Sequence, residues 1–292
     1  MKNIFIVTDF SDASIDAGYY GVELARHFKA NVFLFHAYQA PVPIPESYFV
    51  ISPEQLSEEA IKRLKVEAET INKYHLVNIQ TCAAEGATAD IILSEAKRVG
   101  AELIICGMKG GGKIFRKIFG STTTTLIRKS TIPVIVAPEE LRFRLPGNIV
   151  FASDGETLPT HQHVQILEEM GELFDSKLSI VSVVNGKWDN HFAFREYYLD
   201  FIKELRLMHP TIECLQGTDI PDSLENYIKS NDTDMIAMIP HTHSLLERVF
   251  ASSITEQMAF LTHVPLLILP DLSGEQANGI EMAEHAHRIT DS

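Results

Sequence analysis

Residues 107–121 read GMKGGGKIFRKIFGS and follow directly on the apolar run AELIIC; they hold five glycines and four basic residues. An apolar run without polar alternation is typical of a parallel strand that is buried on both faces. A glycine-rich loop after such a strand lets the backbone approach a ligand without a Cβ in the way. The helix expected from Gly120 onward would present free N–H groups that suit an anion. The segment therefore predicts a parallel α/β sheet with a phosphate site at the strand ends.

The second half of the chain repeats this organisation. The first half opens with KNIFIVTDFSD and the second with GNIVFASDGET, each an apolar strand that ends in aspartate, at Asp9 and Asp154. The halves also close alike, with IPVIVAP and VPLLILP. Strands that alternate with helices imply right-handed crossovers and a doubly wound sheet. We therefore expect two tandem α/β domains, each with five parallel strands, at residues 1–140 and 146–271, followed by a C-terminal tail at 272–292.

Composition and charge argue against a nucleic-acid-binding protein and against a membrane protein. The 292 residues carry a net charge of −14, which disfavours bulk binding to nucleic acid or to an acidic membrane surface. The apolar runs fall short of the roughly 18 residues of a membrane helix, and Asp9 interrupts the N-terminal one. The three cysteines form no CxxC pair, which is typical of a reducing compartment. These features predict a cytoplasmic protein without nucleic-acid or membrane partners.

The glycine loop matches one phosphate-binding pattern in part and another completely. GMKGGGK matches the Walker A pattern as far as Lys113, but Ile114 stands where a Ser or Thr hydroxyl should bind Mg²⁺. A Walker A loop also normally follows the first strand of its unit, whereas this loop follows the fourth. The pattern G-2x-G-9x-G-[ST], in contrast, is complete, and its residues are Gly107, Gly110, Gly120 and Ser121.

The complete pattern resembles the ATP-binding motif of the universal stress protein family. VTDFSDAS after the first strand, LFHAY at the second, LIICGMKG at the fourth and IPVIVAP at the fifth extend the resemblance, which covers nearly the whole chain as two tandem copies. It implies a Rossmann-like, adenine nucleotide alpha hydrolase-like fold in each copy. It also implies that the copies pack together as an intramolecular pseudo-dimer, and it leaves further homodimerisation open.

The resemblance implies an ATP site in the first copy, with or without Mg²⁺. The first strand end would line the adenine and ribose, the second the adenine, the fourth the ribose–phosphate turn, and the following helix start would bind the phosphates. In that order the residues are Val7, Thr8 and Asp9; Ala37; Cys106, Gly107, Met108 and Gly110; and Gly120, Ser121, Thr122 and Thr123. The plainer alternative is that the glycines only shape a tight loop and that Asp9 only caps a helix.

The second copy lacks the glycines of this motif. In MIPHTHSLLERVFASS, Ala251 stands where the first copy has Gly120, so we expect no ATP binding of the family type in this half. His241 and His243 occupy the loop instead, and His161 and His163 follow the first strand of the same copy. Both loops should open on one edge of the sheet. The alternatives for these histidines are a Zn²⁺ site, solvated loop side chains and a pH-sensitive patch.

These patterns predict a cytoplasmic stress-response regulatory protein that binds ATP in its first domain and presents a nucleotide-dependent surface to an unknown protein partner. The missing Walker hydroxyl and the lack of an evident water-activating base favour binding over turnover, and no catalytic residue is assigned. One alternative is a slow ATPase in which Asp9 or His36 reaches the attacking water. Another is a ligand- or metal-binding module that uses the histidine-rich loops of the second domain.

Overall fold

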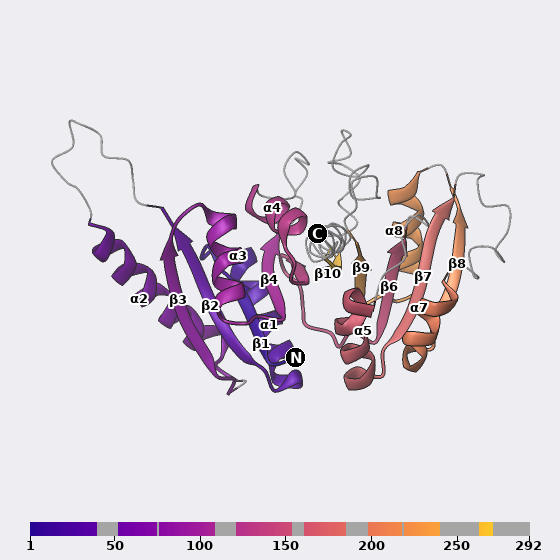
Figure 1. Cartoon of the computed structure of the whole chain (residues 1–292), viewed down its shortest axis with the longest axis horizontal. Helices are drawn as coiled ribbons and strands as arrows, with labels where there is room; N and C mark the ends of the chain where they lie inside the picture. The colour runs from indigo at the N-terminus through magenta and orange to yellow at the C-terminus, as the bar shows by residue number, and fades with distance from the viewer. Residues whose placement is uncertain are drawn as a thin grey trace, which may run out of the picture.

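The computed structural model describes residues 1–39, 52–74, 76–108, 121–153, 161–184, 198–217, 219–239 and 263–270 (Figure 1). The described elements of the first half are β1 Asn3–Val7, α1 Asp12–Phe28, β2 Asn31–Tyr38, α2 Pro53–Ile71, β3 Ile79–Glu85, α3 Thr88–Arg98, β4 Leu103–Met108, α4 Ser121–Lys129 and β5 Val134–Pro138. Those of the second half are β6 Asn148–Ser153, α5 His161–Phe174, β7 Lys177–Val184, α7 Leu199–Glu204, the 3₁₀ helix η1 Arg206–Met208, β8 Thr211–Gln216, α8 Ile220–Ser230, β9 Met235–Met238 and β10 Leu266–Ile268. The predicted tail, residues 272–292, lies outside the described residues.

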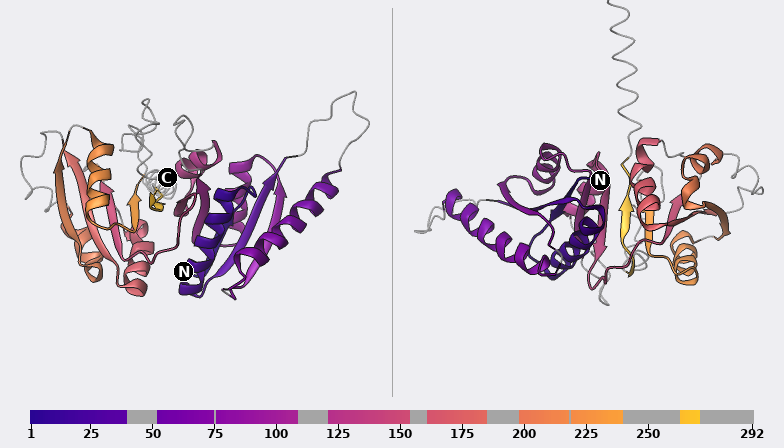
Figure 2. Two further views of the ribbon diagram at one scale, coloured as in Figure 1. Left: turned by 180° about the vertical axis from the view of Figure 1, so that it is seen from behind. Right: turned by 90° about the horizontal axis from the view of Figure 1, so that it is seen from below.

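The described strands form one ten-stranded sheet in the order β3-β2-β1-β4-β5-β10-β9-β6-β7-β8. Neighbouring strands are parallel within each half, whereas β5 and β10 pair antiparallel, with Ile135 opposite Leu267. The predicted α/β fold with two five-stranded parallel units is thus confirmed. The structure adds that the two units join edge to edge into a single sheet (Figure 2).

The inner strands β4, β5, β9 and β10 are apolar throughout because helices cover both faces of the sheet (Figure 2). Successive residues of β4 enter opposite cores: Ile105 packs in the cluster that also takes side chains of α1, α2, α5 and α7. Ile104 packs in the cluster that takes side chains of α3, α4 and α8. In the described part of the chain, no helix has the length and apolar character needed to cross a bilayer.

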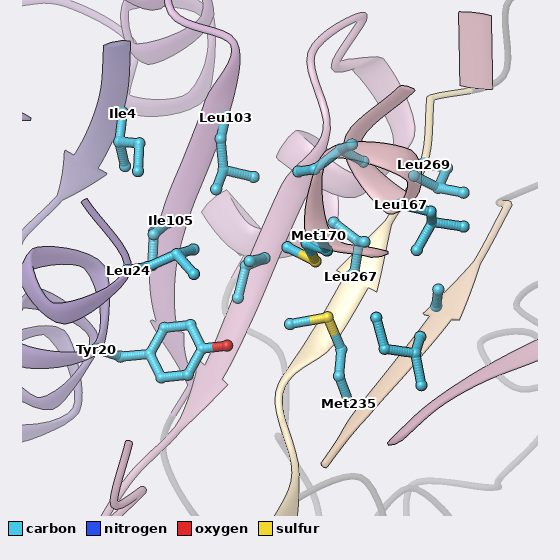
Figure 3. Close-up of a cluster of buried hydrophobic side chains, with 14 of the residues drawn as sticks. Ile4, Tyr20, Leu24, Leu103, Ile105, Leu167, Met170, Met235, Leu267 and Leu269 are labelled. Carbon is cyan, nitrogen blue, oxygen red and sulfur yellow. The ribbon is translucent and has the colours of Figure 1, made fainter. Parts of the chain in front are cut away.

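The first of these cores runs without interruption across the seam between the halves. It contains Ile4 and Ile105 from the first half and Met170 and Leu267 from the second (Figure 3). The segment that connects β5 to β6 adds Phe143, whose ring centroid lies 5.2 Å from that of Tyr20 on α1. A shared apolar core of this kind holds the two halves in a defined relation.

Candidate functional site

A hollow of about 370 Å³ lies at the carboxyl ends of β1, β2 and β4. The chain runs outward from β1 through β2 to β3 and then returns to place β4 on the other side of β1. The hollow therefore sits at the switch in strand order, which is where doubly wound sheets bind their ligands. Its lining from strand ends is Val7, Thr8, Asp9, Ala37, Cys106, Gly107 and Met108, and its lining from helix starts is Ser11, Ala13, Ser14, Thr88, Ile92, Thr122, Thr123 and Leu126.

The turn from β1 into α1 is built around the hydroxyl of Thr8, which is only 2% exposed. Thr8 Oγ1 accepts the N–H of Phe10 at 2.9 Å, lies 3.0 Å from Ser14 Oγ, and donates to Glu67 Oε2 at 3.0 Å. Phe10 adopts a left-handed backbone with φ 63°, which a bulky residue rarely does. The network around Thr8 thus holds a strained turn next to the hollow.

Asp9 has a structural task at this turn as well as a place in the lining. Its Oδ1 accepts the backbone N–H of Ser11 at 3.0 Å and also the Ser11 hydroxyl. Ser11 in turn is the N-cap of α1, and its Oγ accepts the N–H of Ser14. A carboxylate at a helix start is favoured by the helix dipole. The hydrogen bonds of Asp9 at the start of α1 are therefore one reason for an aspartate at this position, beside its place in the lining of the hollow.

Gly107 is required by packing between β4 and α1. A Cβ built on this residue would lie 2.2 Å from the carbonyl oxygen of Ala13 and 2.8 Å from the backbone N of Ser14. The sequence interpretation gave this glycine the task of admitting a ligand. The structure instead fills the space beside its Cα with the start of α1, so the close approach is between two parts of the chain.

Cys106 contributes an inert wall. Burial raises the pKa of its thiol to about 12, an effect that a hydrogen bond with Thr123 only partly offsets. The thiol is therefore protonated at neutral pH, which disfavours a role as a nucleophile. Thr123 is itself buried in the first turn of α4, which brings that helix start against the end of β4.

The first turn of α4 forms one end of the hollow. Thr122 and Thr123 line it, and a helix N-terminus offers free N–H groups and the positive end of a dipole. The backbone of Ser121 begins the helix. Gly110 and Gly120, two of the motif glycines, lie outside the described residues, and so does the connecting segment 109–120.

Helix α2 contacts the turn between β1 and α1, and the sequence did not indicate this contact. Glu67 is 6% exposed, and burial raises the pKa of its carboxyl although the bond from Thr8 acts in the opposite direction. One turn earlier, the Arg63 guanidinium carbon lies 3.9 Å from the centre of the Phe10 ring. The His36 ring from β2 also packs against Phe10, with 4.4 Å between the ring centroids. The three side chains clamp the turn that carries Asp9.

His36 is engaged in this clamp. Its Nδ1 lies 2.8 Å from the carbonyl oxygen of Thr8, so Nδ1 carries the proton and donates it. The proposed slow ATPase would need His36 or Asp9 to activate water. The structure gives both groups hydrogen bonds within the turn instead.

The corresponding strand end of the second half is built differently. Ser153 at the end of β6 shares a buried hydrogen bond with the Tyr198 hydroxyl. His161 and His163 belong by backbone to the first turn of α5, and their side chains are not described; His241 and His243 lie outside the described residues, as does Asp154. Among the residues that are described, no three His, Cys, Asp or Glu side chains gather as a metal site would require. The histidine cluster stays a prediction.

Several lining residues escaped the sequence analysis, namely Ser11, Ala13, Ser14, Thr88, Ile92 and Leu126. These residues share a position in the chain: they lie at or soon after the starts of the helices that follow β1, β3 and β4. Thr88 opens α3, whose N-cap Ala87 makes no side-chain capping bond. A search limited to the spacing of glycines passes over such residues.

Comparison with known proteins agrees with this architecture. The model of the universal stress protein family matches residues 1–138. A universal stress protein of Methanocaldococcus jannaschii is 30% identical over 141 residues, which cover 46% of this chain and 81% of the relative. One of Synechocystis is 23% identical over 290 residues and spans 91% of this chain and 99% of the relative. In fold, the chain is similar to a universal stress protein from Archaeoglobus fulgidus, with a TM-score of 0.70 at 14% identity over 92% of this chain and 98% of that one. The chain therefore belongs to the universal stress protein family.

Proposed function

We propose that this universal stress protein binds ATP in the hollow of its first half and acts in the stress response as a nucleotide-dependent regulator. The observation that carries the proposal is the hollow at the switch in strand order, which joins an apolar wall to a helix start. Its volume of about 370 Å³ lies within the range of roughly 300–1,000 Å³ usual for small-molecule sites.

The residues present fit an adenine nucleotide from one end to the other. Val7 and Ala37 provide apolar surface for a flat base, and Asp9 lies where a ribose hydroxyl would find an acceptor. The first turn of α4 supplies N–H groups and the hydroxyls of Thr122 and Thr123 for the phosphates. In this assignment residues 1–140 form the nucleotide-binding domain, residues 146–271 a degenerate copy, and 272–292 a tail.

Regulation by binding is favoured over turnover because Ile114 stands where a Walker A loop has its Mg²⁺-binding hydroxyl. Asp9 accepts two hydrogen bonds within its own turn and the Cys106 thiol stays protonated, whereas His36, which donates from Nδ1, keeps Nε2 as an acceptor. Rapid hydrolysis needs a residue that orients and deprotonates the attacking water. The protein would instead report nucleotide occupancy to a protein partner.

The test is calorimetric titration of the full chain with ATP, ADP and GTP, with and without Mg²⁺, together with identification of any nucleotide that copurifies. We expect saturable ATP binding that is lost in Gly120→Val. The matched change Ala251→Val in the second half should leave binding intact. Absence of ATP binding to the wild type would sink the proposal. Steady release of phosphate over hours would replace the regulatory binder with a slow ATPase.

A further inference from the structure

A second hollow, of about 340 Å³, lies at the seam between the two halves. It is lined by Tyr20 of α1, by residues 139–142 and Arg144 after β5, and by the residues just before β9 and β10. None of its lining residues belongs to the nucleotide hollow. It opens where the antiparallel pair of β5 and β10 ends, so both halves of the chain are needed to form it.

Two buried hydroxyl groups in this lining have no hydrogen-bond partner in the described part of the chain. They are Tyr20 Oη and Thr233 Oγ1, on residues that are 2% and 6% exposed. Figure 3 shows the Tyr20 ring reaching from α1 toward the seam with its hydroxyl at the far end. Native proteins rarely leave a buried hydroxyl unpaired, because it has given up its hydrogen bonds to water. An ordered water or a polar group of a larger occupant of the hollow would give the two hydroxyls the partner that the described part of the chain lacks.

Tyr20 is held in place and kept protonated. The Phe143 ring packs against its ring, with centroids 5.2 Å apart. Burial, and to a smaller extent the Asp234 carboxylate, raise the pKa of the Tyr20 phenol well above its usual range. The group is a permanent hydrogen-bond donor at physiological pH and suits an acceptor such as a carboxylate oxygen.

The rim of the hollow carries charges of both signs. Arg144 forms ion pairs with two carboxylates, with its Nη1 3.6 Å from Asp232 Oδ1 and 3.9 Å from Asp234 Oδ1, and its side chain is 70% exposed. Exposed pairs of this kind are weak, so the guanidinium is available to a ligand. Asp234 is fixed because its Oδ2 accepts the backbone N–H of Asn148 at 2.9 Å. The backbone of Glu140 is held by a hydrogen bond in which its N–H donates to Asp16 Oδ2 at 2.8 Å.

We propose that the seam hollow binds a free α-amino acid. Its carboxylate would accept hydrogen bonds from Tyr20, Thr233 and Arg144, and its ammonium would face Asp234 and Glu140. A wholly anionic phosphate compound would meet these carboxylates unfavourably, and an uncharged sugar would pair with neither sign. Because the lining comes from α1 on one side and from the approaches to β9 and β10 on the other, an occupant would bridge the two halves.

The test is titration calorimetry and thermal unfolding of the full chain with each of the twenty amino acids, with inorganic phosphate and glucose as comparison probes. We expect at least one amino acid to bind saturably and to raise the melting temperature, and the two other probes to do neither. Failure of every amino acid to bind at millimolar concentration would overturn the proposal. So would binding of phosphate or glucose in their place.

Two variants that remove single hydroxyls make the test specific. Tyr20→Phe and Thr233→Val should each weaken amino-acid binding at least tenfold and leave ATP binding unchanged. Without ligand, both should be as stable as the wild type or more stable, because each removes an unpaired buried hydroxyl. The matched control is Tyr227→Phe, which removes the hydroxyl that donates to Glu213 Oε1 at 2.7 Å.

The control variant Tyr227→Phe should lose stability and keep its affinity for the amino acid. If ligand-free Tyr20→Phe loses stability as Tyr227→Phe does, the Tyr20 hydroxyl holds the seam through a bond of its own, and the proposal falls. Unchanged amino-acid affinity in both hydroxyl-deletion variants would place the ligand elsewhere and also overturn it. Because ATP binding is measured in the same variants, failure here is separable from failure of the nucleotide site.

Discussion

Replacing Gly107 by alanine tests whether packing between β4 and α1 shapes the hollow at the ends of β1, β2 and β4. The added methyl group would lie 2.2 Å and 2.5 Å from the carbonyl oxygen and carbon of Ala13, and 2.8 Å from the backbone N of Ser14. These are backbone atoms, so no side-chain rotation relieves the contact. Either the start of α1 or the end of β4 must move.

The strand is the less movable of the two. β4 is paired on both sides, with β1 and with β5, where Gly107 stands opposite Ala137. The helix start should therefore be displaced, together with Ala13 and Ser14, which line the hollow. Overpacking costs typically about 1–3 kcal/mol, and backbone displacement places this variant near about 3 kcal/mol. At about 2 °C per kcal/mol for a large domain, the melting temperature should fall by about 6 °C.

The assay is thermal and urea unfolding of Gly107→Ala beside Gly147→Ala, with ATP titration of both. A Cβ at Gly147 would meet its nearest atom, Asp234 Oδ2, at 3.5 Å, which is an ordinary contact. We expect that control to stay within about 0.5 kcal/mol of the wild type. Equal stability of the two variants would refute the packing argument. A destabilised Gly107→Ala with unchanged ATP affinity would refute the link from α1 to the hollow.

Three further changes probe the surrounding network. Burial raises the pKa of Glu67, so its ionisation costs stability as pH rises above 4.5. Glu67→Gln should therefore gain stability relative to the wild type with rising pH in urea unfolding, and a pH-independent difference would contradict this. Ser11→Ala removes the N-cap of α1 and a donor to Asp9, and should cost about 0.5–2 kcal/mol in the same assay. Phe143→Ala removes the half-buried ring beside Tyr20, and should cost about 2 kcal/mol, less than the roughly 3–5 of a fully buried phenylalanine, and speed hydrogen exchange in α1.

The strands were predictable because burial on both faces leaves a continuous apolar run. Ile104 and Ile105 enter opposite cores, so neither position tolerates a polar residue. The joining of the two sheets was not predictable in the same way. The pairing of β5 with β10 uses backbone hydrogen bonds, which no residue type encodes. An apolar edge such as VIVA fits a paired edge and a helix-covered edge equally well.

In the candidate site, the strand ends were accessible from sequence and the contacts behind them were not. Thr8 and Asp9 stand at a fixed place after an apolar strand, where parallel strands open onto a ligand. Glu67 sits in a helical segment rich in Glu and Lys, and nothing local distinguishes it from its solvated neighbours. Only the packing of α2 brings its carboxyl to Thr8, 59 residues away along the chain.

The contact between Thr8 and Glu67 has a counterpart in the second half of the chain. Thr8 and Ser153 occupy the same place at the ends of β1 and β6, and each meets a side chain from the region before the third strand of its half, Glu67 or Tyr198. The second half thus closes its strand end with a neutral phenol. The first half keeps a carboxyl whose Oε1 is buried without a partner in the described part of the chain. Burying a carboxyl oxygen without a partner costs stability, and this cost falls in the half whose strand ends form the first hollow.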